Sequence, residues 1–299
     1  MKKLIVYSSI SIMLVLSSCF SFNPCIEGVG SIVEETREIT GFYSVANTTS
    51  FHVYVTQADT FSVLVAAQEN LLPIIETNKS GSTLIIKTRE FSCIRNNDNV
   101  EVYVTLPEIE ELSLTGSGRI VCERIDGDEV ELSVSSSGRM FVDTLYCTDA
   151  YIRNSGSGQF DGQVVDASYA NVKISGSGSI DFGEMYVDDF ELVHSSSGNI
   201  DGFVFGASKS DVSLSGSGRI VLTGDTYDLT TTHTASGRMD LLDLEAVNVR
   251  TRSSGSGNTF VNVNGLLDVT ITASGSVLYV GDPTDIDYRS TGSGELSRY

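Results

Sequence analysis

The sequence predicts an all-β protein whose body is a single-stranded parallel β-helix, in which each coil of the chain, here called a rung, stacks on the next. The first reason is a four-residue phrase, such as Thr115-Gly-Ser-Gly118 or Ser155-Gly-Ser-Gly158, that occurs ten times. The last glycines of successive copies stand 18 to 20 residues apart. A period of this length is typical of stacked-repeat proteins. We therefore expect about ten rungs of about 20 residues, separated by the inter-strand spacing of about 4.8 Å.

The second reason is that positions at a fixed distance from the last glycine share one character. The residue two positions after it is apolar in nine of the ten copies, and the preceding stretch alternates, as in Val130-Glu-Leu132-Ser-Val134. Alternation with a period of two is typical of a strand with one buried face. The columns that we expect to face the core are Ile120, Met140, Phe160, Ile180, Ile200, Ile220, Met239, Val277 and Leu296, then Leu112, Leu132, Ile152, Val172, Leu192 and Val212, and then Ile125, Leu145, Val165, Met185 and Phe205.

The repeated phrase itself predicts a corner of the coil. Two positions before its last glycine every copy has Gly, Ser or Ala, the next residue is Ser in all ten copies, and the first residue is Ser or Thr. Small residues let two backbones approach closely, and stacked hydroxyls can bond to one another or to backbone groups. We interpret the hydroxyls as a structural ladder, because a fold needs ten alike copies whereas a binding site needs one that differs.

The N-terminus has the features of a lipoprotein signal. Two lysines precede a short apolar run, and Leu16-Ser-Ser-Cys19 resembles a bacterial lipobox, in which cleavage exposes a cysteine that receives lipid. We expect residues 1–18 to be the signal peptide, Cys19 to be lipidated and residues 19–30 to be a linker. No other apolar stretch of the sequence is long enough to span a membrane, so the lipid is the expected membrane contact.

Residues 31–108 lack the repeated phrase but have the composition of strands. We expect them to form a β-rich cap on the N-terminal end of the repeats at 109–299, because the terminal units of repeat proteins are atypical. Apolar–polar runs predict the strands, and Gly, Asn and Asp predict the turns. The expected elements are strands at Ser50–Thr56, Phe61–Ala66, Ser82–Thr88 and Asn99–Thr105, hairpin turns at Gln57–Thr60 and Asn78–Gly81, and a helical turn within Glu69–Ile75.

Several of these segments together resemble a known family. The residues that carry the resemblance are Gly41-Phe42, Gln57-Ala58-Asp59, Leu84-Ile85-Ile86, Val104-Thr105-Leu106-Pro107 and Leu114-Thr-Gly-Ser-Gly118. From about residue 31 to 299 the chain is similar to the "putative auto-transporter adhesin, head GIN domain" family of secreted bacterial proteins, common in Bacteroidetes. The resemblance implies a right-handed parallel β-helix and an adhesin-like role, and it supplies no catalytic residues.

The charge of the chain is strongly acidic, with 19 basic and 39 acidic residues. Removal of residues 1–18 deletes two lysines and no acid, so the charge becomes 17 minus 39, or −22. This charge argues against nucleic acid and anionic membrane surfaces as partners. The segment Asp282–Arg289 near the last rung carries several charges and a proline, which blunt an exposed strand edge. We therefore expect a monomer.

Cysteine and histidine residues suggest one disulfide and no metal site. Besides Cys19 there are four cysteines, and Cys25 can pair with Cys93 in an oxidising envelope, tying the linker to the cap. Cys122 and Cys147 stand at different offsets in the repeat, so stacking does not bring them together and either can be a buried free thiol. The expected histidine positions lie too far apart for one metal ion. The histidines are His52, His194 and His233.

One set of charged residues recurs in register and is the candidate binding ladder. Asp161, Asp181 and Asp201 stand three positions after the last glycine, and Arg119 and Arg139 stand one position after it. Three stacked aspartates alone do not provide the six to eight oxygens that calcium takes, so we interpret them as a solvated row. The arginines can bind an anionic sugar or offset nearby acids, and we favour the second. No cofactor or metal is expected.

The function that these observations favour is a non-enzymatic, lipid-anchored protein of the bacterial cell envelope, at the outer membrane. It would act as an adhesin-like or structural module, with a glycan or a surface protein as partner. The alternative is a carbohydrate-active β-helix enzyme, a polysaccharide lyase or hydrolase. Such an enzyme needs acidic or basic residues concentrated on one rung face, and no insertion in the repeat builds a cleft for them.

Overall fold

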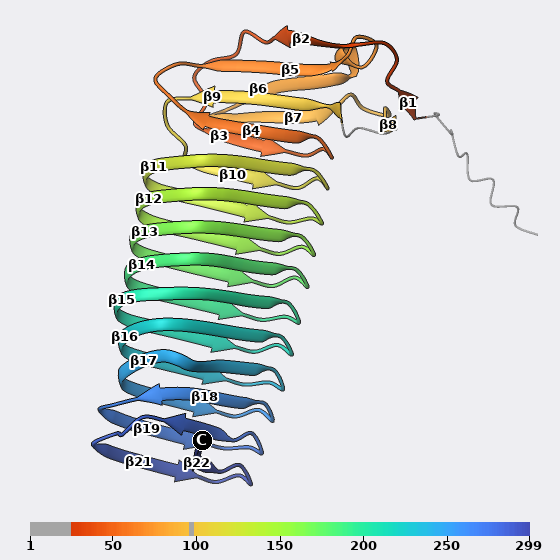
Figure 1. The fold of residues 1–299 in the computed structure, drawn as a ribbon. Coiled ribbons are helices and arrows are strands. Elements are labelled where there is room, and N and C mark those ends of the chain that lie inside the picture. Colours follow the sequence, from red (N-terminus) through yellow and green to blue (C-terminus); the bar gives the residue numbers. More distant parts are fainter. Residues whose placement is uncertain (1–24, 96–98) are drawn as a thin grey trace, which may run out of the picture.

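The protein is a long β-solenoid covered at its N-terminal end (Figure 1). The computed structural model describes residues 25–95 and 99–299, so the expected signal peptide and the lipidation of Cys19 lie outside the described residues. The expected fold class is confirmed, because the described chain is all-β and its parallel coils stack in about nine turns. No helix among the described residues is long and apolar enough to cross a membrane.

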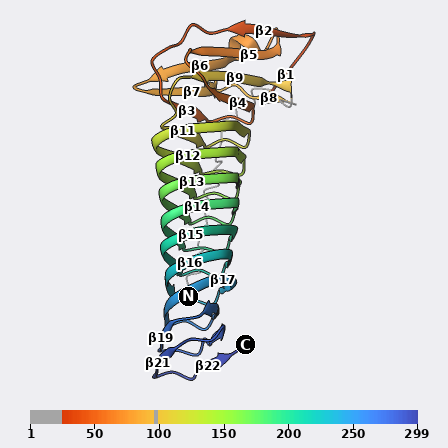
Figure 2. The ribbon, with the colours of Figure 1, turned by 60° about the vertical axis from the view of Figure 1, so that its left-hand side comes forward.

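The body is built from strands that each pair in parallel with the strand one rung away. In β11 and β12, for example, Ile120 pairs with Met140 and Leu132 pairs with Ile152, so like residues stack on like. Figure 2 shows the same stack turned by 60°. The strands of the body are β10 (Glu111–Leu114), β11 (Arg119–Val134), β12 (Arg139–Asn154), β13 (Gln159–Ile174), β14 (Ser179–His194), β15 (Asn199–Leu214), β16 (Arg219–His233), β17 (Arg238–Ser253), β18 (Asn258–Val263), β19 (Leu266–Ile271), β20 (Val277–Val280), β21 (Asp285–Ser290) and β22 (Leu296–Arg298).

The core follows the expected columns with two exceptions, Leu296 and Phe205. The residues expected in the columns two positions after and six positions before the last glycine are buried, apart from the half-buried Leu296. Ile125, Leu145, Val165 and Met185 are also buried, as expected. Phe205 was expected to continue this column, but it is only half-buried. A register shift between β14 and β15 pairs Met185 with Val204, which fills the core instead.

The last glycine of each corner is required because the backbone of the preceding rung of the stack lies directly against it. A Cβ atom on Gly178 would lie 2.0 Å from the carbonyl oxygen of Gly158 and 2.7 Å from Nδ2 of Asn154. Both distances are far below van der Waals contact. The serine one position earlier is exposed in most copies, and Ser137 and Ser117 are 3.4 Å apart at their hydroxyl oxygens. The corner is therefore a close backbone stack with hydroxyls on its outside.

The N-terminal cap contains nine strands among the described residues. They are β1 (Ile26–Glu27), β2 (Ile32–Thr36), β3 (Ser44–Asn47), β4 (His52–Gln57), β5 (Ser62–Gln68), β6 (Ile75–Ser80), β7 (Thr83–Thr88), β8 (Ile94–Arg95) and β9 (Glu101–Leu106), with a 3-10 helix, η1 (Leu72–Ile74), that confirms the expected helical turn. The antiparallel strands β5, β2 and β6 cover the end of the stack by pairing with β9, β5 and β7.

Two rungs within the cap stack in an order that differs from the order of the chain. Strands β3 and β4 pair in parallel with β10 and β11 on one side and with β7 and β9 on the other. The link between β3 and β4, Thr48-Thr-Ser-Phe51, occupies the corner position of the repeated phrase, since Asn47 pairs with Leu114 and His52 with Arg119. The segment between residues 44 and 57 is therefore a rung without the glycines.

The turns expected in the cap have different outcomes. The expected hairpin at Gln57–Thr60 is wrong, because β4 and β5 each pair with β9 and not with each other. The chain must pass over β9 between them. The expected hairpin near Asn78–Gly81 is confirmed, since β6 and β7 are antiparallel partners joined after Ser80, and Gly81 has a φ of 61°.

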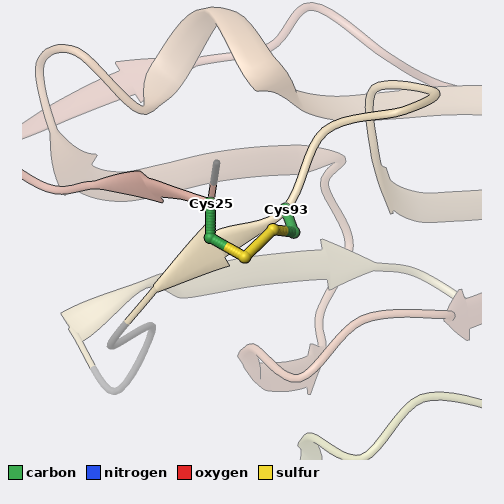
Figure 3. Close-up of a disulfide and its surroundings, with 2 residues drawn as sticks. All are labelled: Cys25 and Cys93. Carbon is green, nitrogen blue, oxygen red and sulfur yellow. A yellow bond between two sulfur atoms is a disulfide. The ribbon is translucent and has the colours of Figure 1, made fainter. Parts of the chain in front are cut away.

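A disulfide joins Cys25 to Cys93 beside the short parallel pair β1 and β8 (Figure 3). Their Cα atoms are 4.7 Å apart, and the N–H of Ile26 donates a hydrogen bond to the carbonyl oxygen of Cys93 at 2.8 Å. The bond attaches the start of the described chain to the residue that precedes β8. Cys122 is buried and Cys147 half-buried, and both are free thiols. Burial raises the pKa of each to about 12, which keeps these thiols protonated.

Candidate functional site

The candidate site lies where β11 to β15 leave the glycine corner. Residues one and three positions after the last glycine both point outward, because side chains alternate along a strand. The outward positions form two rows across these five strands. The first row is Arg119, Arg139, Gln159, Ser179 and Asn199, and the second is Val121, Phe141, Asp161, Asp181 and Asp201. Arg119, Arg139, Asp161, Asp181 and Asp201 together form the polar ladder.

Arg139 links the two rows of the ladder. Its Nη2 donates a hydrogen bond to Oε1 of Gln159 at 2.6 Å, and Nε2 of Gln159 donates to Oδ1 of Asp161 at 2.6 Å. Arg139 Nε also lies 3.7 Å from Oδ2 of Asp161. The arginine therefore offsets a nearby acid, which is the role favoured from the sequence. Arg119 is the neighbouring cation, one rung from Arg139, and it is in register with His52 on its other side.

The three aspartates of the ladder stand on consecutive strands. Asp161 pairs with Asp181, and Asp181 pairs with Asp201. Burial raises the pKa of Asp181, and the charges of Asp161 and Asp201 raise it further. Among the described residues no group of three or more His, Cys, Asp or Glu side chains is arranged to hold a metal ion. The row is a source of hydrogen-bond acceptors, and its central member binds a proton more readily than an ordinary aspartate.

A shallow polar hollow follows the corner beside the first row. Its lining includes the hydroxyls of Ser137, Ser157 and Ser177 together with Arg139 and Gln159. These groups repeat from rung to rung at the strand spacing of about 4.8 Å. They offer donors and acceptors in a line, and such a line is complementary to a chain of hydroxyl groups.

Aromatic side chains that the repeat pattern does not predict extend the second row toward the cap. Tyr54 pairs with Val121 on one side and with Tyr103 on the other, and the two tyrosine rings stack with centroids 5.1 Å apart. The hydroxyl of Tyr103 donates to Glu101 at 2.6 Å. This bond to a carboxylate is the main cause that raises the pKa of Tyr103 to about 12.

These tyrosines were missed because their rung lacks the repeated phrase. Tyr103 is 49 residues beyond Tyr54 in the chain, and only the altered order of stacking brings them into one row. The signal that identifies the rung is Thr48-Thr-Ser-Phe51, which has the hydroxyls of the phrase but not its glycines. The row therefore runs from two aromatic rings, through Val121 and Phe141, to the aspartates.

The family of the chain follows from its sequence and agrees with this architecture. The family model described as "Putative auto-transporter adhesin, head GIN domain" matches residues 41–213 and 183–283, most of the chain. The chain belongs to this adhesin family. No curated protein matches the sequence.

Solved structures similar to this family member share its fold at low identity. One is a "putative lipid binding protein" from Parabacteroides distasonis, 20% identical, with a TM-score of 0.55 over 92% of this chain and 100% of that chain. Another is a "putative adhesin" from the same species, 14% identical, with a TM-score of 0.53 over 92% of this chain and 100% of that chain. At these identities the likeness is one of fold alone.

Two of the three histidines of this adhesin-family member lie away from the ladder. His194 is buried below a corner, where its Nε2 is 2.7 Å from the carbonyl oxygen of Gly198. His233 is buried two rungs further on, with Nδ1 3.0 Å from the hydroxyl of Thr259. Burial lowers the pKa of both. His194 and His233 thus belong to the core, while His52 lies at the surface edge of the ladder beside Arg119.

Proposed function

We propose that the chain is a non-enzymatic, lipid-anchored protein of the bacterial outer membrane, and that its solenoid binds a glycan along the polar ladder. The observation that carries this proposal is the alignment of hydroxyl, amide, guanidinium and carboxylate groups on successive rungs beside two stacked tyrosines. Sugars are bound by hydrogen bonds and by contact with aromatic rings, and the ladder offers both. Membership in an adhesin family supports a role in surface contact.

The proposed anchor is the lipid on Cys19, and it can be tested by fractionation. Replacing Cys19 with Ala removes the acceptor of the lipid, so the variant is expected to leave the membrane fraction. Cys122→Ala is the matched control, because this thiol is buried in the body and should have no part in anchoring. Full retention of Cys19→Ala in detergent-free membranes would refute the anchor without bearing on the ladder.

The proposed glycan site can be tested on the protein released by Cys19→Ala. A glycan array followed by titration of the best ligand should give a dissociation constant that rises about tenfold in Arg139→Ala, as for a lost hydrogen bond to a charged group. Arg238→Ala is the control, because Arg238 stands at the same position of a distant rung and pairs with Asp240. Equal losses in both variants, or no glycan bound at all, would refute the site.

A second candidate function is glycan cleavage, and one observation favours it. The strand spacing of about 4.8 Å that separates paired aspartates is close to the ~5 Å between the carboxyl groups of retaining glycosidases, and the raised pKa of Asp181 suits a proton donor. Against it, Asp161 is held by Gln159 and Arg139. A hydrolysis screen in which wild type releases reducing ends and Asp181→Asn does not would replace binding by catalysis.

A further inference from the structure

The regular stacking of the body is interrupted along β14 to β18. Register shifts occur between β14 and β15, between β15 and β16, between β16 and β17, and between β17 and β18. Gly206 and Gly224 have positive φ angles of 70° and 109° there. The pairings of β11 with β12, β12 with β13 and β13 with β14 have a constant offset throughout. Bulges of this kind re-aim side chains and are common beside functional sites.

The shifted strands present an aromatic cluster to solvent, here called the aromatic patch (Tyr186, Phe203 and Phe205). Phe205 stacks on Tyr186 with centroids 5.3 Å apart, and Phe203 lies parallel to Phe205 at 6.3 Å. Tyr186 and Phe203 remain 44% and 49% exposed. Phenylalanine exposed to this extent costs hydrophobic free energy, and a cluster of such rings marks a contact surface.

The surroundings of the patch are acidic. Glu184 accepts a hydrogen bond from the hydroxyl of Tyr186 at 3.0 Å, and Asp225 accepts one from the N–H of Gly206 at 3.1 Å. Asp166 pairs with Tyr186, and Thr223, the partner of Phe203, pairs with Asp243. The patch lies in two outward rows, one that runs from Thr144 to Asp243 and one that runs from Tyr146 to Glu245. Between these limits neither row holds a basic residue. Their charged members are Asp166, Glu184, Asp225, Asp243 and Glu245.

We propose that the aromatic patch is the docking surface for a basic segment of a partner protein. The methylene stems of lysine and arginine pack on apolar surface while their charged heads remain at its edge, so such a segment matches rings bordered by carboxylates. The rings of Tyr186 and Phe205 are stacked with an interplanar angle of 22°. Because each ring covers one face of the other, less ring face is open to contact with a sugar. A second copy of this chain would bring a net charge of −20 against the same acids.

This surface is separate from the polar ladder and does not depend on the lipid anchor. The ladder lies beside the glycine corner on β11 to β15, whereas the patch lies further along β14 and β15. Its test can therefore succeed or fail independently of the proposed glycan site.

The test measures binding of fluorescent peptides to the full-length protein by anisotropy. The probes are peptides of alternating lysine and leucine, lysine and serine, and glutamate and leucine. The lysine–leucine peptide is expected to bind most tightly and more weakly at high salt. The double variant Tyr186→Ser with Phe203→Ser should bind it about tenfold more weakly, as for the loss of interface anchors.

The control variant is Tyr146→Ser, in the same outward row two rungs from Tyr186, where Arg124 lies 4.5 Å from the ring centroid. Its affinity should stay within about twofold of wild type, and circular dichroism should show that both variants fold. Equal binding of the lysine–serine peptide, or equal binding to the double variant, would overturn the proposal. If the double variant loses glycan binding, the patch is a glycan site instead. If sedimentation shows a dimer of wild type that the double variant loses, the patch binds a second copy of the chain.

Discussion

The rungs built on β11 to β14 and those built on β15 to β17 contain the same corner phrase but differ between the corners. In the first group every pairing joins residues 20 positions apart. In the second group the offset changes within the strands, and a phenylalanine expected in the core lies near the surface. Corners of the same type therefore hold the rungs together, while the strand segments between the corners vary in register and in sequence.

The largest effect should separate a core position of the regular group from its counterpart in the shifted group. Ile180 is fully buried, so Ile180→Asp leaves an unpaired charge in the core and should lower the free energy of unfolding by about 4 kcal/mol or more. Phe205→Asp should cost much less, because Phe205 is only half-buried. Urea unfolding of both variants measures the difference, and equal losses would place Phe205 in the core after all.

A glycine of the corner should matter more than a glycine of the bulge. Gly178→Ala places a Cβ 2.0 Å from a backbone oxygen and should destabilise the protein by about 3 kcal/mol. At Gly206 no atom lies within 4 Å of the new Cβ, so only the positive φ of 70° is unfavourable, at about 1 kcal/mol. Thermal unfolding checks the order, and a larger loss at Gly206 would show that the bulge limits stability.

Acid should weaken the second half of the solenoid through its buried histidines. The pKa of His194 and of His233 is lowered by burial from 6.5, so the unfolded chain binds protons more readily than the folded one. Their contribution to stability is complete above pH 6.5 and is lost as the pH falls below it. Melting temperatures between about pH 8 and pH 5 measure this loss.

The control for this titration is supplied by the chain itself. Asn154 occupies the same column two rungs before His194, and its Nδ2 donates to the carbonyl oxygen of Gly158 at 2.8 Å. The double variant His194→Asn with His233→Asn should therefore fold and lose less stability between these pH values. An unchanged pH dependence would assign it to carboxylates.

The smallest effect concerns the corner hydroxyls. Ser196 donates a hydrogen bond to the carbonyl oxygen of Gly176, so Ser196→Ala should cost about 0.5–1.5 kcal/mol. Ser177 is exposed, and Ser177→Ala should change the free energy of unfolding by less than about 0.5 kcal/mol. A comparison of the two by chemical unfolding tests whether the half-buried or the exposed hydroxyls stabilise the stack.

The sequence by itself determined the solenoid, its period and most of its core. It could do so because each rung repeats the same contacts, so one column such as Ile120, Met140 and Phe160 reports a stack in which like residues pair. It also placed the polar ladder, since Asp161, Asp181 and Asp201 stand at one offset and parallel pairing preserves offsets.

Only the tertiary structure decided where the stack departs from the period. The pairing of Tyr54 with Tyr103 depends on a cap that stacks out of chain order, and no local pattern encodes which rung lies beside which. The exposure of Phe205 depends on a bulge that shifts the register after Phe182, and a shift by one residue exchanges the inner and outer faces of a strand. Both depend on pairing between strands that are distant in the sequence.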